Sequence, residues 1–564
     1  MSEKGSMKSV EAAAEATPED GRRRSKDVVD QDSSEVISAE SDEKAMATID
    51  DETPTDDPEK MSGLPLYATI TVVIFMMFCL AIEMTIISTA IPRITDEFQS
   101  LSDIGWYGSS YFMCIAAFQP AWGKLLKYFP IKFVFPAAAV GFCIGCIICA
   151  VAQNSETLIA GRAVMGALGA GLAPGVYTVV AHIAPPKQKP MYMGALGAVF
   201  GIASVVGPPL GGVFTDHATW RWVFWINLPI IAPAIILFLI FFRQPKSTYE
   251  PHSTPLKEKF LQLDLPGSFI ILGSVICYLL AMQEGGTEYA WNSARIIGLL
   301  VGFGLLLILF CVEQYFAGER AVFQGNLVKN RTLVVMWWIA FFITGAFQLV
   351  LYYVPVYFQS TRDVSAASSG VNILALVLSC SFFVILSGGI MAFWGRYVEL
   401  LLIGSVPLCV GAGLLVTLGR HTSTGKYVGY ELLLGTGIGL NLQIPIMVAQ
   451  SIVPQNDVST VSSIVLWGQT MGSAILVSAG QAGFANKLLD ALPSDAPNVN
   501  PYQVLTIGAS ELADFFEGDE LNGVLDAYME GLKVPFIMTV VVMCVASVIV
   551  PIAKRGSIKG KIPM

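Results

Sequence analysis

The chain has 564 residues, of which 54% are hydrophobic and only 14% charged, and its mean hydropathy is +0.61. Soluble proteins carry roughly 25% charged residues, so this composition excludes a soluble globular protein and indicates a multispanning membrane protein. The formal net charge of −10 arises entirely in residues 1–62, which hold 18 acidic and 8 basic residues. The rest of the chain is neutral, and we expect no nucleic-acid partner.

Residues 1–62 are rich in Ser, Thr, Asp and Glu and contain few apolar residues. Such a segment cannot bury enough apolar surface to fold on its own. It also lacks the early apolar run of a signal peptide. We predict a disordered acidic tail on the cytoplasmic side.

Fourteen apolar runs follow, each long enough for the roughly 20 residues with which a helix crosses a bilayer. Lys and Arg concentrate in alternate loops and in both tails, which by the positive-inside rule places both termini in the cytoplasm. The predicted spans are 65–91, 104–123, 133–152, 158–183, 192–214, 222–242, 265–283, 294–316, 333–358, 370–392, 399–418, 427–452, 459–481 and 533–553.

Glu83 in the first span and Arg162 in the fourth are charges inside the membrane, which are usually functional. At 1.5 Å rise per residue they lie about 12 and 6 Å below the outer helix ends, so an ion pair between them is plausible. The pair either switches Glu83 between holding and releasing a proton, or it is a static structural salt bridge. Glu431 lies near the outer start of span 12. It could be a second carboxylate that binds a proton or the substrate, but we favour a solvated residue at a helix end.

Residues 194–212 carry a row of small residues at helical spacing in the fifth span. Such a row lets two helices approach closely in lipid, and two adjacent prolines leave carbonyl groups unpaired and favour a kink. A statically packed helix pair and a hinge both fit this pattern. The row consists of Gly194, Gly197, Gly201, Ser204, Pro208 and Gly211, and the same stretch contains Gly207, Pro209 and Gly212.

Polar side chains inside the spans are expected to face the interior of the bundle rather than lipid. An apolar, aromatic cavity with few charges suits amphipathic organic molecules. The sequence contains no phosphate-binding loop for ATP, no metal-binding set and no catalytic constellation, so we expect neither a cofactor nor enzyme activity. The candidate cavity residues are Gln119, Phe347, Gln348, Tyr352, Asn441, Gln443 and Gln469.

Four stretches resemble the major facilitator superfamily, and specifically its fourteen-span drug:proton antiporter branch with the fungal toxin and multidrug efflux pumps. AIEMTIISTAIPRI surrounds Glu83, and LIAGRAVMGALGAG contains Arg162. GPPLGG at 207–212 is similar to a motif that the family associates with exporters. In GKLLKYFPIK, at 123–132, Lys127 stands where the family has an aspartate.

This resemblance implies an all-α membrane fold with two six-helix halves, residues 63–243 and 321–553, that rock about a central site. Residues 244–320 would add two inserted transmembrane helices. The C-terminal half would carry an outer loop at 482–532, and 554–564 would form a basic cytoplasmic tail.

The same resemblance assigns proton coupling to Glu83 and Arg162, a hinge to the small residues of 197–212, and a gating turn to Gly123, Lys124 and Lys132. Because Lys127 cannot replace the family's aspartate, either another acid locks this gate or the turn only sets topology.

We therefore predict a secondary active transporter that uses protons to export amphipathic toxins, drugs or secondary metabolites by alternating access. Multidrug resistance and mycotoxin export are typical of this group. We expect a monomer in the plasma membrane, with a vacuolar or vesicular membrane as the alternative location. The alternative function is an importer of the same fold, such as a siderophore carrier. A membrane enzyme or sensor is disfavoured, because no catalytic residues cluster at one face.

Overall fold

The computed structural model describes residues 61–98, 104–185, 188–244, 255–362, 364, 366–507 and 512–557. The predicted acidic tail lies outside the described residues except for Met61 and Ser62, and so does the end of the predicted basic tail.

The described residues fold almost entirely into helices. Thirteen helical segments are long and apolar enough to cross a membrane. The remaining predicted span, the second, is α4 (Ile104–Tyr128), a 25-residue helix. It is less apolar because it includes Gln119, Lys124 and Lys127. With α4, the helices match the fourteen predicted spans, and the all-α membrane fold is confirmed.

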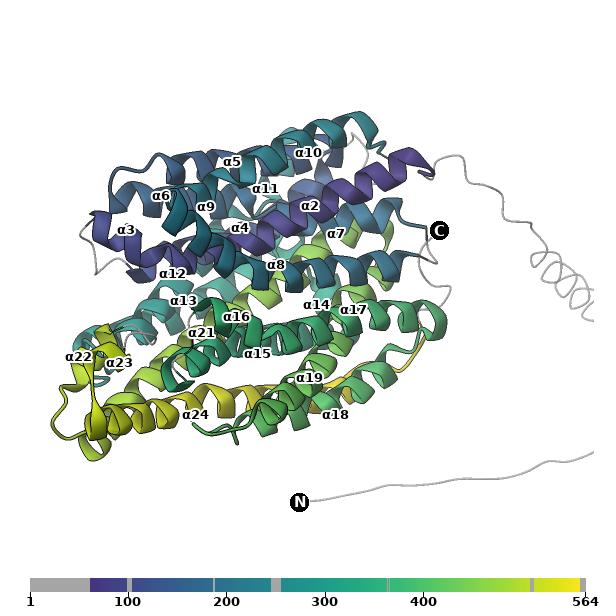
Figure 1. The fold of residues 1–564 in the computed structure, drawn as a ribbon. Helices are drawn as coiled ribbons and strands as arrows, with labels where there is room; N and C mark the ends of the chain where they lie inside the picture. The colour runs from purple at the N-terminus through teal and green to yellow at the C-terminus, as the bar shows by residue number, and fades with distance from the viewer. Residues whose placement is uncertain are drawn as a thin grey trace, which may run out of the picture. The chain divides into compact units, whose positions relative to one another are not determined.

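The first six spans form the group drawn from purple to teal in the upper part of Figure 1. Several spans are made of two helices joined end to end. The helices are α2 (Leu64–Ile86), α3 (Ile91–Phe98), α4 (Ile104–Tyr128), α5 (Ile131–Ala150), α6 (Ser155–Gly169), α7 (Leu172–Ile183), α8 (Lys189–His217), α9 (Trp222–Trp225) and α10 (Asn227–Phe241).

The last six spans form the green to yellow group of Figure 1. Their helices are α15 (Arg331–Arg362), α16 (Ala366–Asn372), α17 (Leu374–Trp394), α18 (Tyr397–Leu415), α19 (Thr424–Asn441), α20 (Ile444–Ser451), α21 (Val458–Asp495), α22 (Pro501–Thr506), α23 (Leu512–Phe515) and α24 (Gly518–Ile549).

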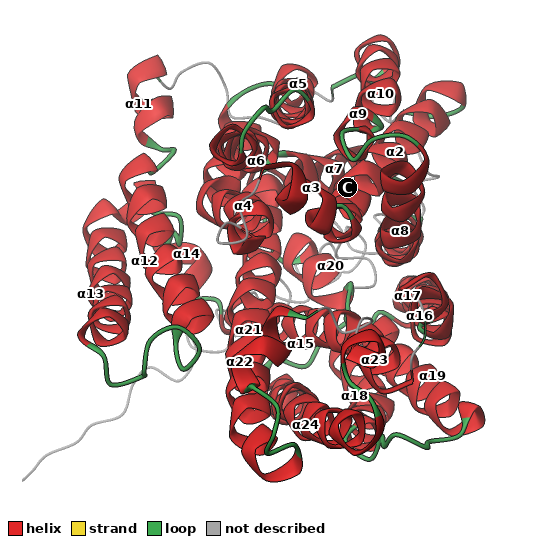
Figure 2. Ribbon diagram, turned by 60° about the vertical axis from the view of Figure 1, so that its left-hand side comes forward, coloured by secondary structure: helices red, strands yellow, loops and turns green. Residues whose placement is uncertain are grey.

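Between the two groups come α11 (Leu256–Leu261), the inserted pair α12 (Leu265–Glu284) and α13 (Ala294–Ala317), and the short α14 (Gly325–Val328). The helices α12 and α13 pack on each other at one edge, and α12 also contacts α4 and α21 (Figure 2). Asp264 accepts a hydrogen bond from the backbone N–H of Gly267 at 3.1 Å and so caps α12.

Several predicted spans are interrupted, or extend beyond their predicted ends. The fourth span breaks between α6 and α7, and the twelfth breaks between α19 and α20, where Pro445 lacks the N–H that would continue the helix. Much of the predicted outer loop 482–532 is helical, because α21 extends to Asp495 and α24 already begins at Gly518.

The helix α8 passes through Pro208 and Pro209 without a break. A helix that bends at proline stays helical on both sides of the bend, so the kink expected from the sequence stays a prediction.

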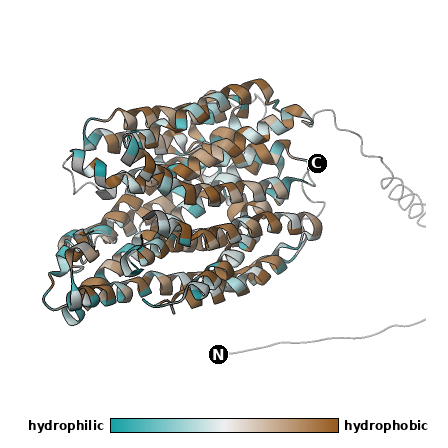
Figure 3. Ribbon diagram, viewed as in Figure 1, coloured by the Kyte–Doolittle hydropathy of each residue, from teal (hydrophilic) through white to brown (hydrophobic). Residues whose placement is uncertain are grey.

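Large apolar side chains remain exposed along the outer faces of the helices, among them Phe133, Ile240, Leu305 and Val548. Figure 3 shows hydrophobic residues over most of each helix and hydrophilic residues mainly near helix ends and loops. Such a surface would aggregate in water, whereas a bilayer covers it.

One end of the bundle, here called the inner end, carries Lys124, Lys127 and Arg331, and we predict that it faces the cytoplasm. Contacts tie its segments together: Arg331 Nε donates to the carbonyl of Ile552, and Tyr397 donates to the carbonyl of Lys554. The opposite end is called the outer end.

Candidate functional site

Glu83 of α2 and Arg162 of α6 form an ion pair in the interior of the N-terminal group. Arg162 Nη1 lies 2.6 Å from Glu83 Oε1, and both side chains are fully buried, at 0% exposure. The structure therefore brings together the two charges that the sequence places inside the membrane.

Three further residues complete this site, and sequence reasoning did not single them out. Asn227, the first residue of α10, donates through Nδ2 to Glu83 Oε2 at 2.8 Å. Arg162 Nε donates to the carbonyl of Tyr107 at 2.7 Å, and the ring of Tyr111 lies 4.6 Å from the guanidinium. We call these five residues the Glu83 site. Asn227 is an amide within an apolar span, which is the criterion that selected the cavity glutamines.

The Glu83 site is suited to holding and releasing a proton. Two charges taken out of water are tolerated only while they remain paired, and separating them leaves an uncompensated carboxylate. A proton on Glu83 removes that charge. Three buried polar atoms of the site have no hydrogen-bond partner among the described residues: Arg162 Nη2, Asn227 Oδ1 and Tyr111 Oη. They leave spare donors and acceptors beside the carboxylate for a proton or a water.

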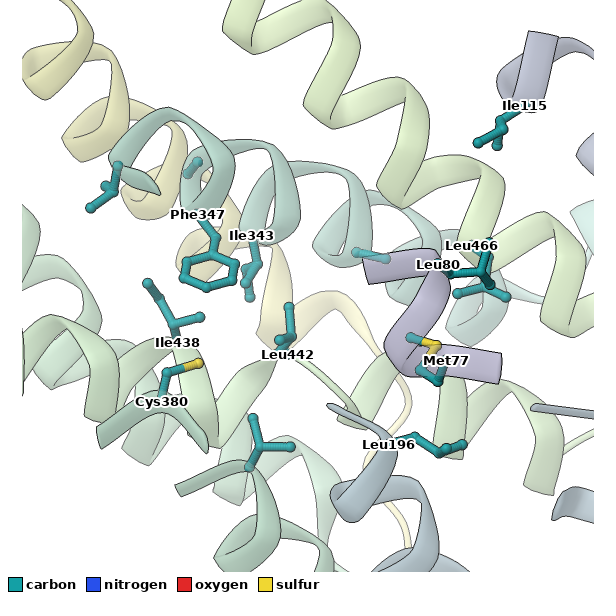
Figure 4. Close-up of a cluster of buried hydrophobic side chains, with 14 of the residues drawn as sticks. Met77, Leu80, Ile115, Leu196, Ile343, Phe347, Cys380, Ile438, Leu442 and Leu466 are labelled. Carbon is teal, nitrogen blue, oxygen red and sulfur yellow. The ribbon is translucent and has the colours of Figure 1, made fainter. Parts of the chain in front are cut away.

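A cavity of about 90 Å³ lies between the two helix groups. Met77 and Leu80 of α2, Ile115 of α4, Phe347 of α15 and Leu466 of α21 are among its apolar wall residues (Figure 4). Leu80 and Met84, which flank Glu83 in the sequence, both line it. A wall built from both groups is expected where substrate sits between two moving halves.

Five of the predicted cavity residues lie on this wall, and two do not. The five are Gln119, Phe347, Gln348, Gln443 and Gln469. Tyr352, one turn beyond Gln348 on α15, is 52% exposed and does not line the cavity. Asn441 is buried against Gly404 of α18 and donates to the carbonyl of Gly437 at 2.8 Å. Its position near a helix break, rather than the cavity, explains this buried amide.

Two of the cavity glutamines join the helix groups. Thr470 of α21 donates to Gln119 Oε1 of α4 at 3.2 Å. Gln443 Nε2 donates to the hydroxyl of Tyr177 on α7 at 2.9 Å. Because drug-sized pockets hold about 300 Å³ or more, a substrate of that size needs these contacts to open.

The small residues of α8 face two different helices. A Cβ atom at Gly194 would lie 2.9 Å from the carbonyl oxygen of Val384, and one at Gly201 would lie 2.9 Å from Ser381 Oγ, both on α17. At Gly207 and Gly211 it would collide with Thr85 and with Ile86, at the end of α2.

This row of glycines, which we call the α8 seam (residues 194–211), joins one group to the other through α17 and to its own group through α2. Gly212 has nothing within 4 Å of such an atom and does not belong to the contact. It points about 100° away from its neighbour Gly211 around the axis of α8, as successive helical residues do.

The predicted gating turn lies at the inner end against the other group. A Cβ at Gly123 would collide with Ser463 of α21. Lys124 Nζ donates to the carbonyls of Arg320 and Ala321, the latter at 2.6 Å. Lys127 pairs with Asp457, just before α21, at 2.9 Å. Lys132 contributes its backbone N–H, which donates to Gln244 at 3.3 Å. An acid from the other group thus meets the lysine that replaces the family's aspartate.

Glu431 corrects the sequence analysis. We expected a solvated residue at a helix end, but its side chain is buried at 1% exposure. The residue lies about two turns inside α19, seven residues after its start, where α17 covers it.

Two helix groups that meet around a central cavity, with a buried ion pair beside it, define a membrane transporter of the alternating-access type. The family model for the Major Facilitator Superfamily matches residues 73–477, and the chain belongs to that family. The resemblance seen in the motifs is thereby confirmed.

The chain is 42% identical over 495 residues to the MFS-type transporter thnB of Trichoderma harzianum, covering 88% of this chain and 85% of that protein. It is 41% identical over 503 residues to the MFS-type efflux pump MFS1 of Arthroderma benhamiae, covering 89% and 93%. Its fold is similar to that of the proton:xylose symporter XylE, with a TM-score of 0.57, 13% identity, and coverage of 88% of this chain and 97% of that one.

Proposed function

We propose that this protein is a proton-coupled efflux pump for amphipathic organic compounds, such as toxins, drugs or secondary metabolites. The observation that carries the proposal is the Glu83 site, because Glu83 of this fully buried ion pair lies in the sequence between Leu80 and Met84, which line the central cavity. A relative at 41% identity is named as an efflux pump, which supports export.

The mechanism follows from electrostatics. With Glu83 ionised, Arg162 and Asn227 hold the carboxylate and link α2 to α6 and α10. A proton from the outer side neutralises Glu83 and weakens these links, which lets the helices around the cavity rearrange and release substrate outward. Loss of that proton to the inner side restores the ion pair. The cycle exchanges protons for substrate and needs no nucleotide.

The cavity supports this class of substrate. Its wall combines apolar and aromatic side chains with glutamine amides and hydroxyl groups, and none of its wall residues is charged. Such a surface binds molecules with a large apolar body and a few polar groups. We further propose a monomer in the plasma membrane with both termini in the cytoplasm, in keeping with the basic inner end.

The test is transport into membrane vesicles, with a panel of fluorescent amphipathic compounds as probes. Inverted vesicles that contain the native protein should accumulate a probe without ATP when a proton gradient is imposed, and an uncoupler should abolish the uptake. Glu83→Gln should lose this uptake and keep probe binding. Glu530→Gln, which changes a carboxylate that is 43% exposed, is the control and should transport normally.

Two results would contradict the proposal. Full gradient-driven uptake by Glu83→Gln would remove Glu83 from coupling. Accumulation in right-side-out vesicles instead of inverted ones would identify an importer, such as a siderophore carrier.

A further inference from the structure

Glu431 of α19 is a buried acid that the mechanism above does not use. Its side chain is 1% exposed, and neither carboxyl oxygen has a hydrogen-bond partner of acceptable geometry among the described residues. The backbone of Leu376, in the first turn of α17, lies beside the carboxyl group and favours its charged form, but it brings no counter-charge. A buried carboxylate without a cation is strongly unfavourable, and the protonated acid is the form that such a site accepts.

The position of Glu431 corresponds to that of Arg162 in the other helix group. Arg162 is seven residues after the start of α6, and Glu431 is seven residues after the start of α19. A glycine follows four residues later in both, Gly166 and Gly435. Both spans then break, after α6 and after α19.

The packing is equivalent as well. A Cβ atom at Gly166 would collide with the carbonyl of Tyr111 on α4, and one at Gly435 would collide with the carbonyl of Leu376 on α17. The helices α4 and α17 each form the second span of their group. An acid in the C-terminal group therefore occupies the place that the paired arginine occupies in the N-terminal group.

The charged groups around Glu431 are few. Its main neighbours are α17 and α18, with lesser contacts to α15 and α20. Neither α17 nor α20 carries a charged residue, and Cys380 is the titratable group of α17. On α18, Tyr397, Glu399 and Cys409 are titratable, and Glu399 lies in the first turn, at the inner end. Since α19 starts at the outer end, Glu399 lies far from Glu431 along the bundle axis.

One candidate cation for Glu431 lies on α15. Arg362, the last residue of α15, lies 5.3 Å from the ring of Tyr427 and 5.8 Å from that of Tyr357. Tyr427 is one turn, about 6 Å, outward of Glu431 on α19, and its hydroxyl lies 3.4 Å from Asn372 Oδ1. The guanidinium donates to the carbonyl of Thr422 and forms no ion pair with Glu431. The remaining titratable groups of these elements are Lys426 and Tyr430 on α19, and Arg331, Tyr352 and Tyr353 on α15.

We propose that Glu431 is a second proton-binding site, located in the C-terminal helix group and carrying its proton in the state shown by the structure. Its role in a transport cycle rests on the proposed function, whereas its binding of a proton does not. Each helix group would then carry one proton-binding carboxyl, Glu83 stabilised as an ion pair and Glu431 stabilised as a neutral acid.

The test is infrared spectroscopy of the purified full-length protein in detergent, titrated from neutral to alkaline pH. A protonated carboxylic acid has a carbonyl absorption that its carboxylate lacks. The native protein at neutral pH should show this band, and Glu431→Gln should lose the intensity of one carboxyl group. Glu530→Gln, at an exposed carboxylate, should keep it. Alkaline pH should remove the Glu431 contribution from the native spectrum.

An unchanged band in folded Glu431→Gln would overturn the proposal, and so would a Glu431 contribution that stays constant throughout the titration. If Glu431→Gln fails to fold, Glu431→Asp retains a carboxyl group and should shift the band rather than remove it. The measurement involves no substrate. A failure of transport by Glu83→Gln and a failure of this spectroscopic test are therefore separate results.

Discussion

Each oxygen of the Glu83 carboxylate has its own buried partner, Arg162 for one and Asn227 for the other. The charge of Arg162 provides the attraction, while the amide of Asn227 fixes the orientation of the carboxylate and stabilises the ionised form. Substitution of Asn227 removes its hydrogen bond and leaves Arg162 in place, so it separates the role of the amide from that of the charge.

Asn227→Leu should shift the pH dependence of transport to higher pH while leaving the ion pair in place. The hydrogen bond from the amide favours the carboxylate over the acid, and a hydrogen bond to a charged group contributes about 1.5–3 kcal/mol, or roughly one to two pH units. The measurement is probe uptake by inverted vesicles as a function of internal pH. A profile that only decreases in height, without moving, would show that Asn227 has a purely structural role.

Glu97 provides a second pH-dependent contact at the outer end, outside the spans. Arg221 donates to its Oε1 at 2.9 Å and Trp220 donates to its Oε2 at 2.7 Å. These hydrogen bonds hold the pKa of Glu97 below its ordinary value of 4.5. The contact therefore stabilises the fold above pH 4.5, and this contribution is lost as the pH falls through the lowered pKa.

Glu97→Gln should lower the free energy of unfolding by about 0.5 kcal/mol at neutral pH, a modest amount because the pair is partly exposed. At a pH below the lowered pKa, the variant and the native protein should be equally stable. Thermal unfolding in detergent at both pH values measures the difference. A difference of the same size at both pH values would contradict the role of the carboxylate charge.

At the scale of elements, α8 is the helix that contacts both groups closely. The α8 seam meets α17 with its first part and the end of α2 with its last part. A helix with close contacts on both partners moves only if one of these contacts slides, which makes the seam a candidate hinge.

Gly211→Ala and Gly212→Ala form a matched pair on this helix. A methyl group at Gly211 collides with Ile86 and Thr89, so we expect a loss of stability of roughly 1–3 kcal/mol. A methyl group at Gly212 meets nothing within 4 Å, and alanine should stabilise the helix by up to about 1 kcal/mol. Thermal unfolding in detergent tests both variants. Equal effects would show that the close approach of α2 does not depend on Gly211.

At the scale of the whole molecule, the inner end is where the two groups are joined by charge. Lys127 and Asp457 lie 2.9 Å apart, with side chains that are 8% and 26% exposed. Asp457 precedes α21, and a carboxylate there also interacts favourably with the N-terminus of that helix. This pair supplies the acid that the sequence of the gating turn lacks.

Reversal of charge tests this inner lock. Lys127→Asp places two acids together and should lower transport strongly. A half-buried pair is worth between roughly 1 and 3 kcal/mol, and its loss favours opening of the inner end. Lys127→Asp combined with Asp457→Lys should recover part of the activity, and the lost helix-terminus interaction limits the recovery. A double variant no more active than Lys127→Asp would argue against the lock.

The sequence carried enough information to predict the fourteen spans and the approach of Glu83 to Arg162. Apolar runs of sufficient length and rare charges inside them are local signals that the bilayer makes unambiguous. Asn227 satisfied the same criterion and was missed. Asp457 lay in a loop between spans, where an acid has no distinguishing pattern.

Glu431 shows why local sequence signals do not predict every buried charge. A residue at its distance from the start of α19 can be exposed to water or buried. The packing of α17 over α19 is what excludes water from the Glu431 side chain. The same holds for the cavity. Seven polar or aromatic residues within spans were predicted to line it, yet two of them, Tyr352 and Asn441, do not.

By itself, the sequence determined that the chain spans a membrane many times, that Glu83 and Arg162 lie inside the membrane and which family the chain resembles, because the cost of polar groups in lipid acts on each residue separately. The tertiary structure alone decided which residues meet across the two helix groups. Those meetings, Lys127 with Asp457 and the α8 seam with α17, join positions far apart in the chain, and the relative placement of packed helices sets them.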